Sequence, residues 1–316
     1  MMREKEIIKK ILDNLNKVII GKEAEISNIL KGVIANGHIL IEDVPGVGKT
    51  TLVKALAKTI DLTYSRIQFT PDLLPSDITG ISIYNQKDME FEFKEGPIFS
   101  NIVLADEINR TSPKTQSALL EVMEENQVSE GKKTYKLKTP FVVMATQNPI
   151  DYDGTFRLPE AQLDRFIIKV SLGYPSAEAE VDILEKYRES NPLQELSSVV
   201  TAEDILYLQD AVAKVRVARV INEYIVRIAN KTRESNYISL GVSTRAILAL
   251  QKVAQASALL AGRDYVIPED VKENAALVLS HRIIMSSTGK ANGYGERETI
   301  EDILKMVETP RITVNV

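Results

Sequence analysis

A glycine-rich turn, Asp43–Thr50, stands between a short apolar run, His38–Glu42, and a helical pattern, Thr50–Thr59. Gly46 and Gly48 allow the backbone to adopt positive φ without a side-chain clash, so several N–H groups can face one anion. The helix that follows adds its positive N-terminal end. A strand, a glycine-rich loop and a helix in this order predict a phosphate-binding loop in a parallel α/β sheet.

Each part of this loop has an expected role toward a nucleotide. We expect Lys49 to reach the β- and γ-phosphates and the Thr50 hydroxyl to coordinate magnesium. The expected binding residues are Val44, Pro45, Gly46, Val47, Gly48, Lys49, Thr50 and Thr51. The usual loop begins with glycine, whereas this chain has Asp43, whose carboxylate must point away from the phosphates. The alternative, a glycine-rich turn without a ligand, is disfavoured by the strand and helix on either side.

Short apolar runs alternate with helical patterns in the first half of the chain, which predicts a parallel sheet covered by helices on both faces. The predicted strands are His38–Glu42, Tyr64–Phe69, Ile102–Ala105, Phe141–Thr146 and Phe166–Val170. Two other segments, Gly80–Phe93 and Gln127–Leu137, show period-two patterning around a polar turn and predict β-hairpins. The hairpins either cover sheet edges or project as contact loops.

Beyond Gly173–Pro175 the strand patterns end and helical periodicity continues almost to the C-terminus. Thr201 and Ser243 are suited to cap helices, and Pro268 is suited to the first turn of another. We therefore expect an α/β domain over residues 1–174 and a smaller, all-helical domain over residues 175–316.

Two adjacent acids, Asp106 and Glu107, directly follow the third predicted strand. We expect Asp106 to bind magnesium through water and Glu107 to polarise the water that attacks the γ-phosphate. Many strands end in acids that are only solvated, so this pattern alone leaves both interpretations open. The phosphate-binding loop earlier in the chain favours the catalytic one.

Three more polar residues are candidates for the same chemistry. Asn148 ends the fourth strand and can position water, although a turn-forming Asn-Pro is the alternative. Arg165 precedes the last strand, and its guanidinium, entering from a neighbouring subunit, suits a transferring phosphoryl group. The alternative is an ion pair with Asp164 or a nearby acid. Arg245 lies in the first turn of a helix, where it opposes the helix dipole and needs an anion. A nucleotide phosphate clamped between the domains is one such anion, and a solvent-facing arginine is the alternative.

The composition narrows the kinds of site. The chain has no cysteine and only two histidines, which rules out thiolate chemistry and disfavours zinc. Its net charge of −5 gives no electrostatic reason for non-specific binding to nucleic acid, although a basic channel lining remains compatible with it. The N-terminus lacks the apolar core of a signal peptide, and no stretch approaches 18 apolar residues. We expect a cytoplasmic protein that does not insert into a membrane.

Taken together, these residues resemble an AAA+ ATPase and, more narrowly, the MoxR family. The resemblance covers nearly the whole chain, from about Ile19 to Arg282. The sequence blocks that carry it are Gly96–Phe99, Leu104–Arg110, Pro113–Gln116, Ala145–Pro149, Leu158–Phe166 and Gly262–Val266.

The resemblance implies a P-loop sheet of spatial order 5-1-4-3-2, a helical lid, and hexameric rings with ATP and Mg²⁺ at the subunit junctions. The two hairpins match insertions of this clade. The resemblance assigns phosphate and magnesium to Lys49 and Thr50, the Walker B pair to Asp106 and Glu107, sensor 1 to Asn148, the arginine finger to Arg165, sensor 2 to Arg245, and adenine packing to the region of Ile20 and Gly21.

MoxR-type ATPases resemble chaperones, so we expect an ATP-hydrolysing machine that remodels, matures or assembles client complexes. A partner with a von Willebrand factor A domain would come from another polypeptide. The alternative is a nucleic-acid motor of the helicase type, which only Lys132 and Lys133 at a hairpin tip favour. A nucleotide-gated scaffold without hydrolysis is disfavoured because the acids and arginines are all present, and transcription activation because the first hairpin lacks a matching motif.

Overall fold

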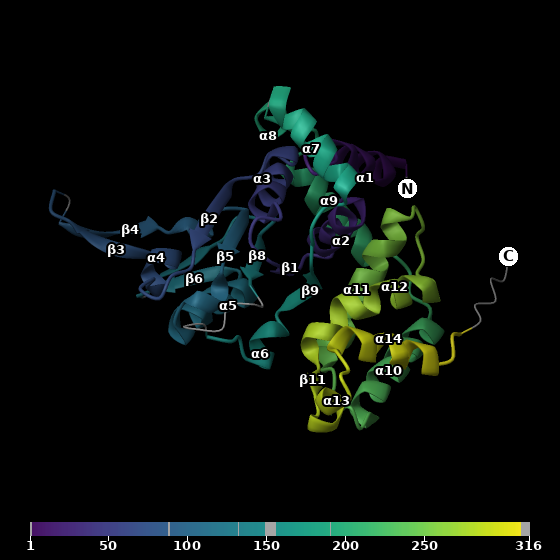
Figure 1. The fold of residues 1–316 in the computed structure, drawn as a ribbon. Coiled ribbons are helices and arrows are strands. Elements are labelled where there is room, and N and C mark those ends of the chain that lie inside the picture. Colours follow the sequence, from purple (N-terminus) through teal and green to yellow (C-terminus); the bar gives the residue numbers. More distant parts are fainter. Residues whose placement is uncertain (1, 88, 132, 149–155, 190, 311–316) are drawn as a thin grey trace.

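The computed structural model describes residues 2–87, 89–131, 133–148, 156–189 and 191–310, so Lys132 and Pro149 lie outside the described residues. A five-stranded parallel sheet forms the centre of the first half (Figure 1). Its strands are β1 (His38–Glu42), β2 (Tyr64–Gln68), β5 (Ile102–Asp106), β8 (Val142–Gln147) and β9 (Phe166–Val170). The spatial order β2-β5-β8-β1-β9 confirms the expected 5-1-4-3-2 arrangement of the five strands.

Helices cover both faces of this sheet, which is why its strands are apolar runs without alternation. Ile39 and Ile41 point into a core with the helices of one face, and Leu40 points into a second core with α5 on the other. The helices of the first half are α1 (Met2–Leu15), α2 (Glu23–Ile34), α3 (Lys49–Thr59), α4 (Pro75–Thr79), α5 (Pro113–Glu125) and α6 (Glu160–Leu163), with short 3₁₀ turns η1 (Pro97–Phe99) and η2 (Ile108–Arg110).

Both predicted hairpins are present. β3 (Gly80–Asn85) pairs with β4 (Glu90–Glu95), and β6 (Gln127–Glu130) pairs with β7 (Lys133–Lys136), each as a separate antiparallel pair. Neither hairpin joins the central sheet, so neither extends one of its edges. The β3–β4 hairpin reaches far from the rest of the molecule (Figure 1).

The second half is helical, as predicted, and one strand pair interrupts it. Its helices are α7 (Ala177–Glu189), α8 (Pro192–Glu195), α9 (Ala202–Lys214), α10 (Arg219–Glu234), α11 (Thr244–Leu260), α12 (Pro268–Leu279), η3 (Ser280–Arg282), α13 (Ser287–Ala291) and α14 (Glu296–Met306). The strands β10 (Ile238–Leu240) and β11 (Ile284–Met285) pair antiparallel, so the expectation of an all-helical region was wrong in this detail. Strands of three and two residues are too short to show a period-two pattern.

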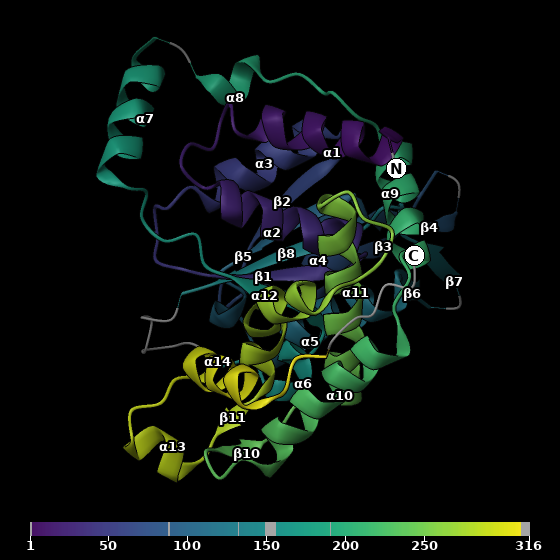
Figure 2. The ribbon, with the colours of Figure 1, turned by 90° about the vertical axis from the view of Figure 1, so that its right-hand side faces the viewer.

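The helical half packs directly on the sheet. Helix α11 contacts α2 and β9, and α12 contacts β9 (Figure 2). One apolar core continues from the first half into the second. Arg282 is buried where the halves meet, and it binds Asp164 and the carbonyl groups of Phe166 and Ile167. The division into residues 1–174 and 175–316 stays a prediction, because this core crosses it. Among the described residues, no helix has the length and apolar content needed to cross a bilayer.

The buried imidazole of His38, at the start of β1, makes stability depend on pH. The N–H of Val143 donates to Nδ1 over 3.0 Å, and Nε2 donates to the carbonyl of Met123 over 2.9 Å, which fixes the neutral ring. Burial lowers the pKa of His38 to about 4. The unfolded chain, with a pKa near 6.5, therefore binds more protons as the pH falls from 6.5 toward 4, and stability is lost over that range.

We expect the His38 contribution to lower the free energy of unfolding by about 2 kcal/mol between pH 7 and pH 5. Urea unfolding at both pH values measures it, with His38→Gln as the comparison because glutamine keeps a donor and an acceptor without titrating. His281 is also buried with a lowered pKa and adds to the slope of both proteins. An equal pH dependence in the variant and the parent would contradict the assignment to His38.

Candidate active site

The glycine-rich loop has the backbone conformation that the sequence predicts. Gly46 and Gly48 have φ of +85° and +88°, and Gly48 is the N-cap of α3. A Cβ added to either glycine would meet no other atom within 4 Å. The loop is therefore open toward solvent at the positive end of a helix, where an anion is stabilised.

The loop also carries the expected cation and hydroxyl. The Lys49 ammonium donates to the carbonyl oxygens of Asp43 and Val44 over 3.0 and 2.9 Å, so it lies over the start of the loop. Thr50 and Thr51 lie half-buried in the first turn of α3. This arrangement suits a phosphate group and a cation that prefers oxygen ligands.

Asp43, which replaces the usual glycine, faces away from the loop. Its side chain is buried, and Oδ2 accepts hydrogen bonds from the N–H groups of Leu172 and Gly173 over 2.5 and 2.7 Å. Oδ1 accepts from the N–H of Val44 over 2.9 Å. The carboxylate therefore joins the loop to the segment that follows β9, and its orientation is the one that phosphate binding requires.

The acids Asp106 and Glu107 lie at the carboxyl edge of the sheet and are linked through Thr146 of β8. The Thr146 hydroxyl donates to Asp106 Oδ1 over 2.6 Å and accepts from the N–H of Glu107 over 2.8 Å. The guanidinium of Arg66, on β2, donates to Asp106 Oδ2 from Nε over 3.0 Å and from Nη2 over 2.6 Å. Both oxygens of Asp106 are therefore held in fixed directions.

The Glu107 carboxylate is held from two sides. Its Oε2 accepts from Gln68 Nε2 and from Arg110 Nη1, each over 2.9 Å. Glu107 has a φ of +58°, a left-handed conformation that is uncommon for residues other than glycine and recurs at functional sites. The turn after β5 thus directs this carboxylate toward β2 and fixes it there.

The donor set fits a hydrated magnesium ion. A hydroxyl (Thr50) and a carboxylate (Asp106) are ligands that magnesium accepts, and the ion usually keeps several waters. β8 lies between β1 and β5, so the ends of those strands are about 10 Å apart, which leaves room for phosphate and water between them. Arg66 and Thr146 occupy part of the Asp106 carboxylate, and further lone pairs remain to accept from metal-bound water. Within the described residues, no cluster of three or more acids or histidines forms a separate metal site.

Two arginines lie at the opposite edge of the sheet. Arg165 precedes β9, and its Nη2 pairs with Glu124 Oε2 over 2.9 Å, while Arg245 Nη2 pairs with Oε1 of the same carboxylate. The three side chains line a cavity of about 410 Å³ together with His38 and Phe141, which lie at the amino ends of β1 and β8. The arginines therefore form one cluster with Glu124.

The length of β1 separates this cluster from the phosphate-binding loop. Five residues of strand span about 16 Å, so Arg245 does not reach the loop of its own chain. α11 begins against the turn before β9, where Ser243 donates to Asp164, so Arg245 lies at this edge. A contact between Arg245 and a nucleotide phosphate stays a prediction. Arg165 pairs with a nearby acid, Glu124, as the alternative interpretation expected, whereas Asp164 pairs with Arg282.

The expected adenine region lies beside the loop. Gly21 has a φ of +69°, and a Cβ there would lie 2.7 Å from the Cβ of Ala179 on α7. The Lys22 ammonium donates to the carbonyl oxygens of Leu172 and Tyr174. Ile20 and Gly21 therefore adjoin the segment after β9 that Asp43 also binds, so they lie next to the phosphate-binding loop.

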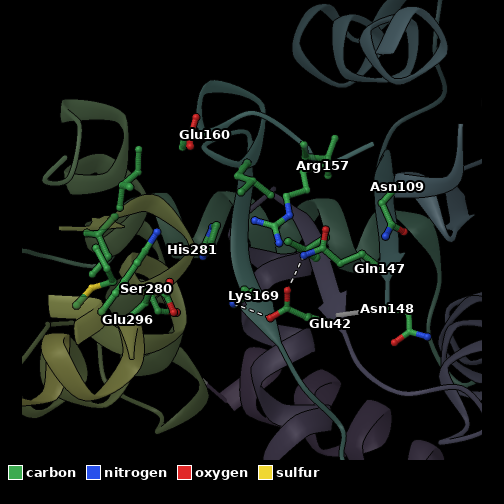
Figure 3. Close-up of a pocket in the computed structure, with 17 residues that line it drawn as sticks. Glu42, Asn109, Gln147, Asn148, Arg157, Glu160, Lys169, Ser280, His281 and Glu296 are labelled. Carbon is green, nitrogen blue, oxygen red and sulfur yellow. Dashed lines mark hydrogen bonds and ion pairs between the residues drawn. The ribbon is translucent and has the colours of Figure 1, made fainter. Parts of the chain in front are cut away.

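A polar cavity of about 620 Å³ lies between the carboxyl ends of β1, β8 and β9 and the segment from η3 to α14 (Figure 3). On its sheet side, Glu42 accepts from Gln147 over 2.6 Å and pairs with Lys169 over 2.8 Å. Asn148 follows β8 and lines the same cavity. Asn148 therefore shares the carboxyl edge with the two acids, as its position after the fourth strand predicts.

Sequence reasoning missed Arg66, Gln68, Thr146 and Glu124. Arg66 and Gln68 are two residues apart on the edge strand β2, so their side chains share one face. Two polar side chains on one face of a strand could have indicated a contact with the acids at the end of β5. Thr146 stood inside a predicted strand beside Asn148. Glu124 had no local signal, because its partners lie 41 and 121 residues away.

Comparison with known proteins agrees with this geometry. The family model described as "ATPase family associated with various cellular activities (AAA)" matches residues 38–168, and the model described as "AAA lid domain" matches residues 230–305. A crystal structure of a protein from Cytophaga hutchinsonii, assigned as an ATPase, superposes with a TM-score of 0.91 at 44% identity and covers 98% of this chain and 97% of that one.

Full-length relatives give the family. Protein YeaC of Bacillus subtilis is 52% identical over 96% of this chain and 95% of its own length. Chaperone MoxR1 of Mycobacterium tuberculosis is 40% identical over 98% of this chain and 84% of its own length. Protein MoxR of Paracoccus denitrificans is 29% identical over 86% of this chain and 87% of its own length. With its five-stranded sheet, phosphate-binding loop and helical lid, this chain belongs to the MoxR family of AAA+ ATPases.

Proposed function

We propose that this ATPase works as a hexameric ring that hydrolyses ATP at its subunit junctions and uses the resulting motion to remodel client proteins. The observation that carries the proposal is the position of Arg165 and Arg245 at the sheet edge opposite the loop of their own chain. One protomer therefore holds a phosphate site without these cations and a cation pair without a phosphate. A ring of identical subunits joined head to tail brings the two together.

In this proposal the residues at the carboxyl edge bind the nucleotide and prepare the attacking water. The loop amides and Lys49 bind the phosphates, and Thr50 and Asp106 hold Mg²⁺, which neutralises phosphate charge when it is bound. Glu107 orients a water molecule and accepts its proton, while Gln68 and Arg110 fix the direction of the carboxylate. Asn148 is the second group that positions the water.

The proposed client contact is the β3–β4 hairpin. Ile83, Met89 and Phe91 are 43%, 74% and 71% exposed on it, and the hairpin stands away from the body of the molecule (Figure 1). Exposed apolar side chains gathered on a projecting element are typical of protein-contact sites. One full-length relative is named a chaperone. The family resemblance adds a partner with a von Willebrand factor A domain on another chain, and the dependence on ATP supports a cytoplasmic location.

The test compares tagged Glu107→Gln, expected to keep ATP bound, with Lys49→Ala and with Glu107→Gln/Phe91→Ser. Native mass spectrometry with Mg·ATP should show a hexamer for Glu107→Gln. Proteins that co-purify with this hexamer should be lost from Lys49→Ala, and lost from the double variant although it still assembles. A protein that stays monomeric with ATP at all concentrations, or the same co-purifying proteins on all three variants, would contradict the proposal. Stimulation of hydrolysis by DNA would favour the helicase alternative.

A further inference from the structure

Glu124, near the end of α5, is the residue that joins the two arginines. Each oxygen of its carboxylate binds one guanidinium, Oε2 that of Arg165 and Oε1 that of Arg245. The three residues come from α5, from the turn before β9 and from the first turn of α11. A single carboxylate therefore connects three elements that are distant in the sequence.

Without an anion between them, the two guanidinium groups would repel each other. Arg245 also lies at the N-terminal end of α11, where the helix dipole disfavours a cation. Arg282 and Lys252 add positive charge to the same cavity. Among the described residues that line this cavity, the other acid is Asp164, which binds Arg282 and Ser243. Glu124 is thus the carboxylate that lets both arginines stay together.

The two arginines differ in how firmly α5 holds them and in how exposed they are. Arg165 also donates from Nη1 to the carbonyl of Leu120, one turn before Glu124, so it is anchored to α5 at two points. Arg245 is 47% exposed, whereas Arg165 is 28% exposed. The hydrogen bond from Arg245 and the charge of Arg165 lower the pKa of Glu124, so the carboxylate stays ionised.

We propose that Glu124 is a positioning residue that holds Arg165 and Arg245 side by side, so that they meet the terminal phosphate of the neighbouring subunit's nucleotide as one unit. The inference rests on the proposed function, because it requires the arginines to act across a subunit junction. Two preorganised cations stabilise developing phosphoryl charge without reorganisation at the moment of reaction. Separated arginines would have to be gathered in each turnover.

The test is Glu124→Gln, which keeps the size of the side chain and one acceptor oxygen but removes the charge. We expect kcat to fall about tenfold in the assembled enzyme, while the KM for ATP and nucleotide binding by the protomer stay unchanged. Glu124→Asp, which keeps the charge, should recover part of the loss. Glu125→Gln, on the adjacent exposed position, is the matched control and should retain parental turnover.

A double variant separates positioning from general destabilisation. If Glu124 acts through Arg245, Glu124→Gln should cost less than twofold in a background that already carries Arg245→Ala. Unchanged or faster turnover in Glu124→Gln, or an equal tenfold loss in that background, would overturn the proposal. Full turnover in Arg165→Ala would instead refute the proposed function, whatever Glu124→Gln does.

Discussion

Glu107→Gln is expected to bind Mg·ATP as tightly as the parent and to hydrolyse it about 10²–10³ times more slowly. The amide cannot accept the proton of the attacking water. Its oxygen can still accept the hydrogen bonds from Gln68 and Arg110 that hold the parent carboxylate, so the local structure should persist. Calorimetric titration with ATP and a phosphate-release assay on the same preparation measure binding and turnover separately.

Glu121→Gln is the matched control, because Glu121 is an exposed acid on α5, away from the carboxyl edge. It should hydrolyse ATP at the parental rate. Turnover by Glu107→Gln within twofold of the parent would show that another group accepts the proton. A loss of ATP binding would show instead that Glu107 supports the nucleotide site itself.

The central sheet was predictable because its strands are buried on both faces, so the sequence marks them as apolar runs that turns and helices separate. Their order in space followed from the family resemblance and not from the pattern of any one strand. The β10–β11 pair was missed because strands of three and two residues leave no periodic signal. The helix cap at Ser243 was predictable because capping is a local interaction, and its side chain accepts from the backbone N–H of Ala246, three residues ahead.

Some site residues could be placed from the local sequence, whereas others depend on how distant elements pack together. In a parallel sheet, residues that directly follow strands meet at one edge, so the positions of Lys49, Asp106, Glu107 and Asn148 followed from the chain order. Arg245 belongs to a helix, α11, whose place depends on how it packs against α2 and β9. No local pattern states which end of the sheet such a helix approaches, so the sequence alone does not say which nucleotide Arg245 meets.

Mixing two inactive variants is expected to restore ATP hydrolysis if Arg165 acts across the junction. Arg165→Ala should bind ATP as a protomer and lose about 10³-fold in turnover, because a missing arginine finger leaves the phosphoryl charge unstabilised. Lys49→Ala should fail to bind the phosphates. In an equimolar mixed ring, about a quarter of the junctions pair an intact loop with an intact arginine. A phosphate-release assay on the mixture should show that fraction of the parental rate, whereas an arginine acting within its own chain would give no recovery.

The same experiment with Arg245→Ala decides between the two placements of that residue. Because Arg245 shares Glu124 with Arg165, we expect both arginines to enter from the same neighbour. Arg245→Ala should then be rescued by Lys49→Ala and should not be rescued by Arg165→Ala, since every junction would still lack one arginine. If Arg245 instead served the nucleotide of its own chain, the outcome would invert: Lys49→Ala would give no rescue, and Arg165→Ala would restore about a quarter of the junctions. The two mixtures therefore give opposite answers, and the direction of the difference follows from a single carboxylate in the structure.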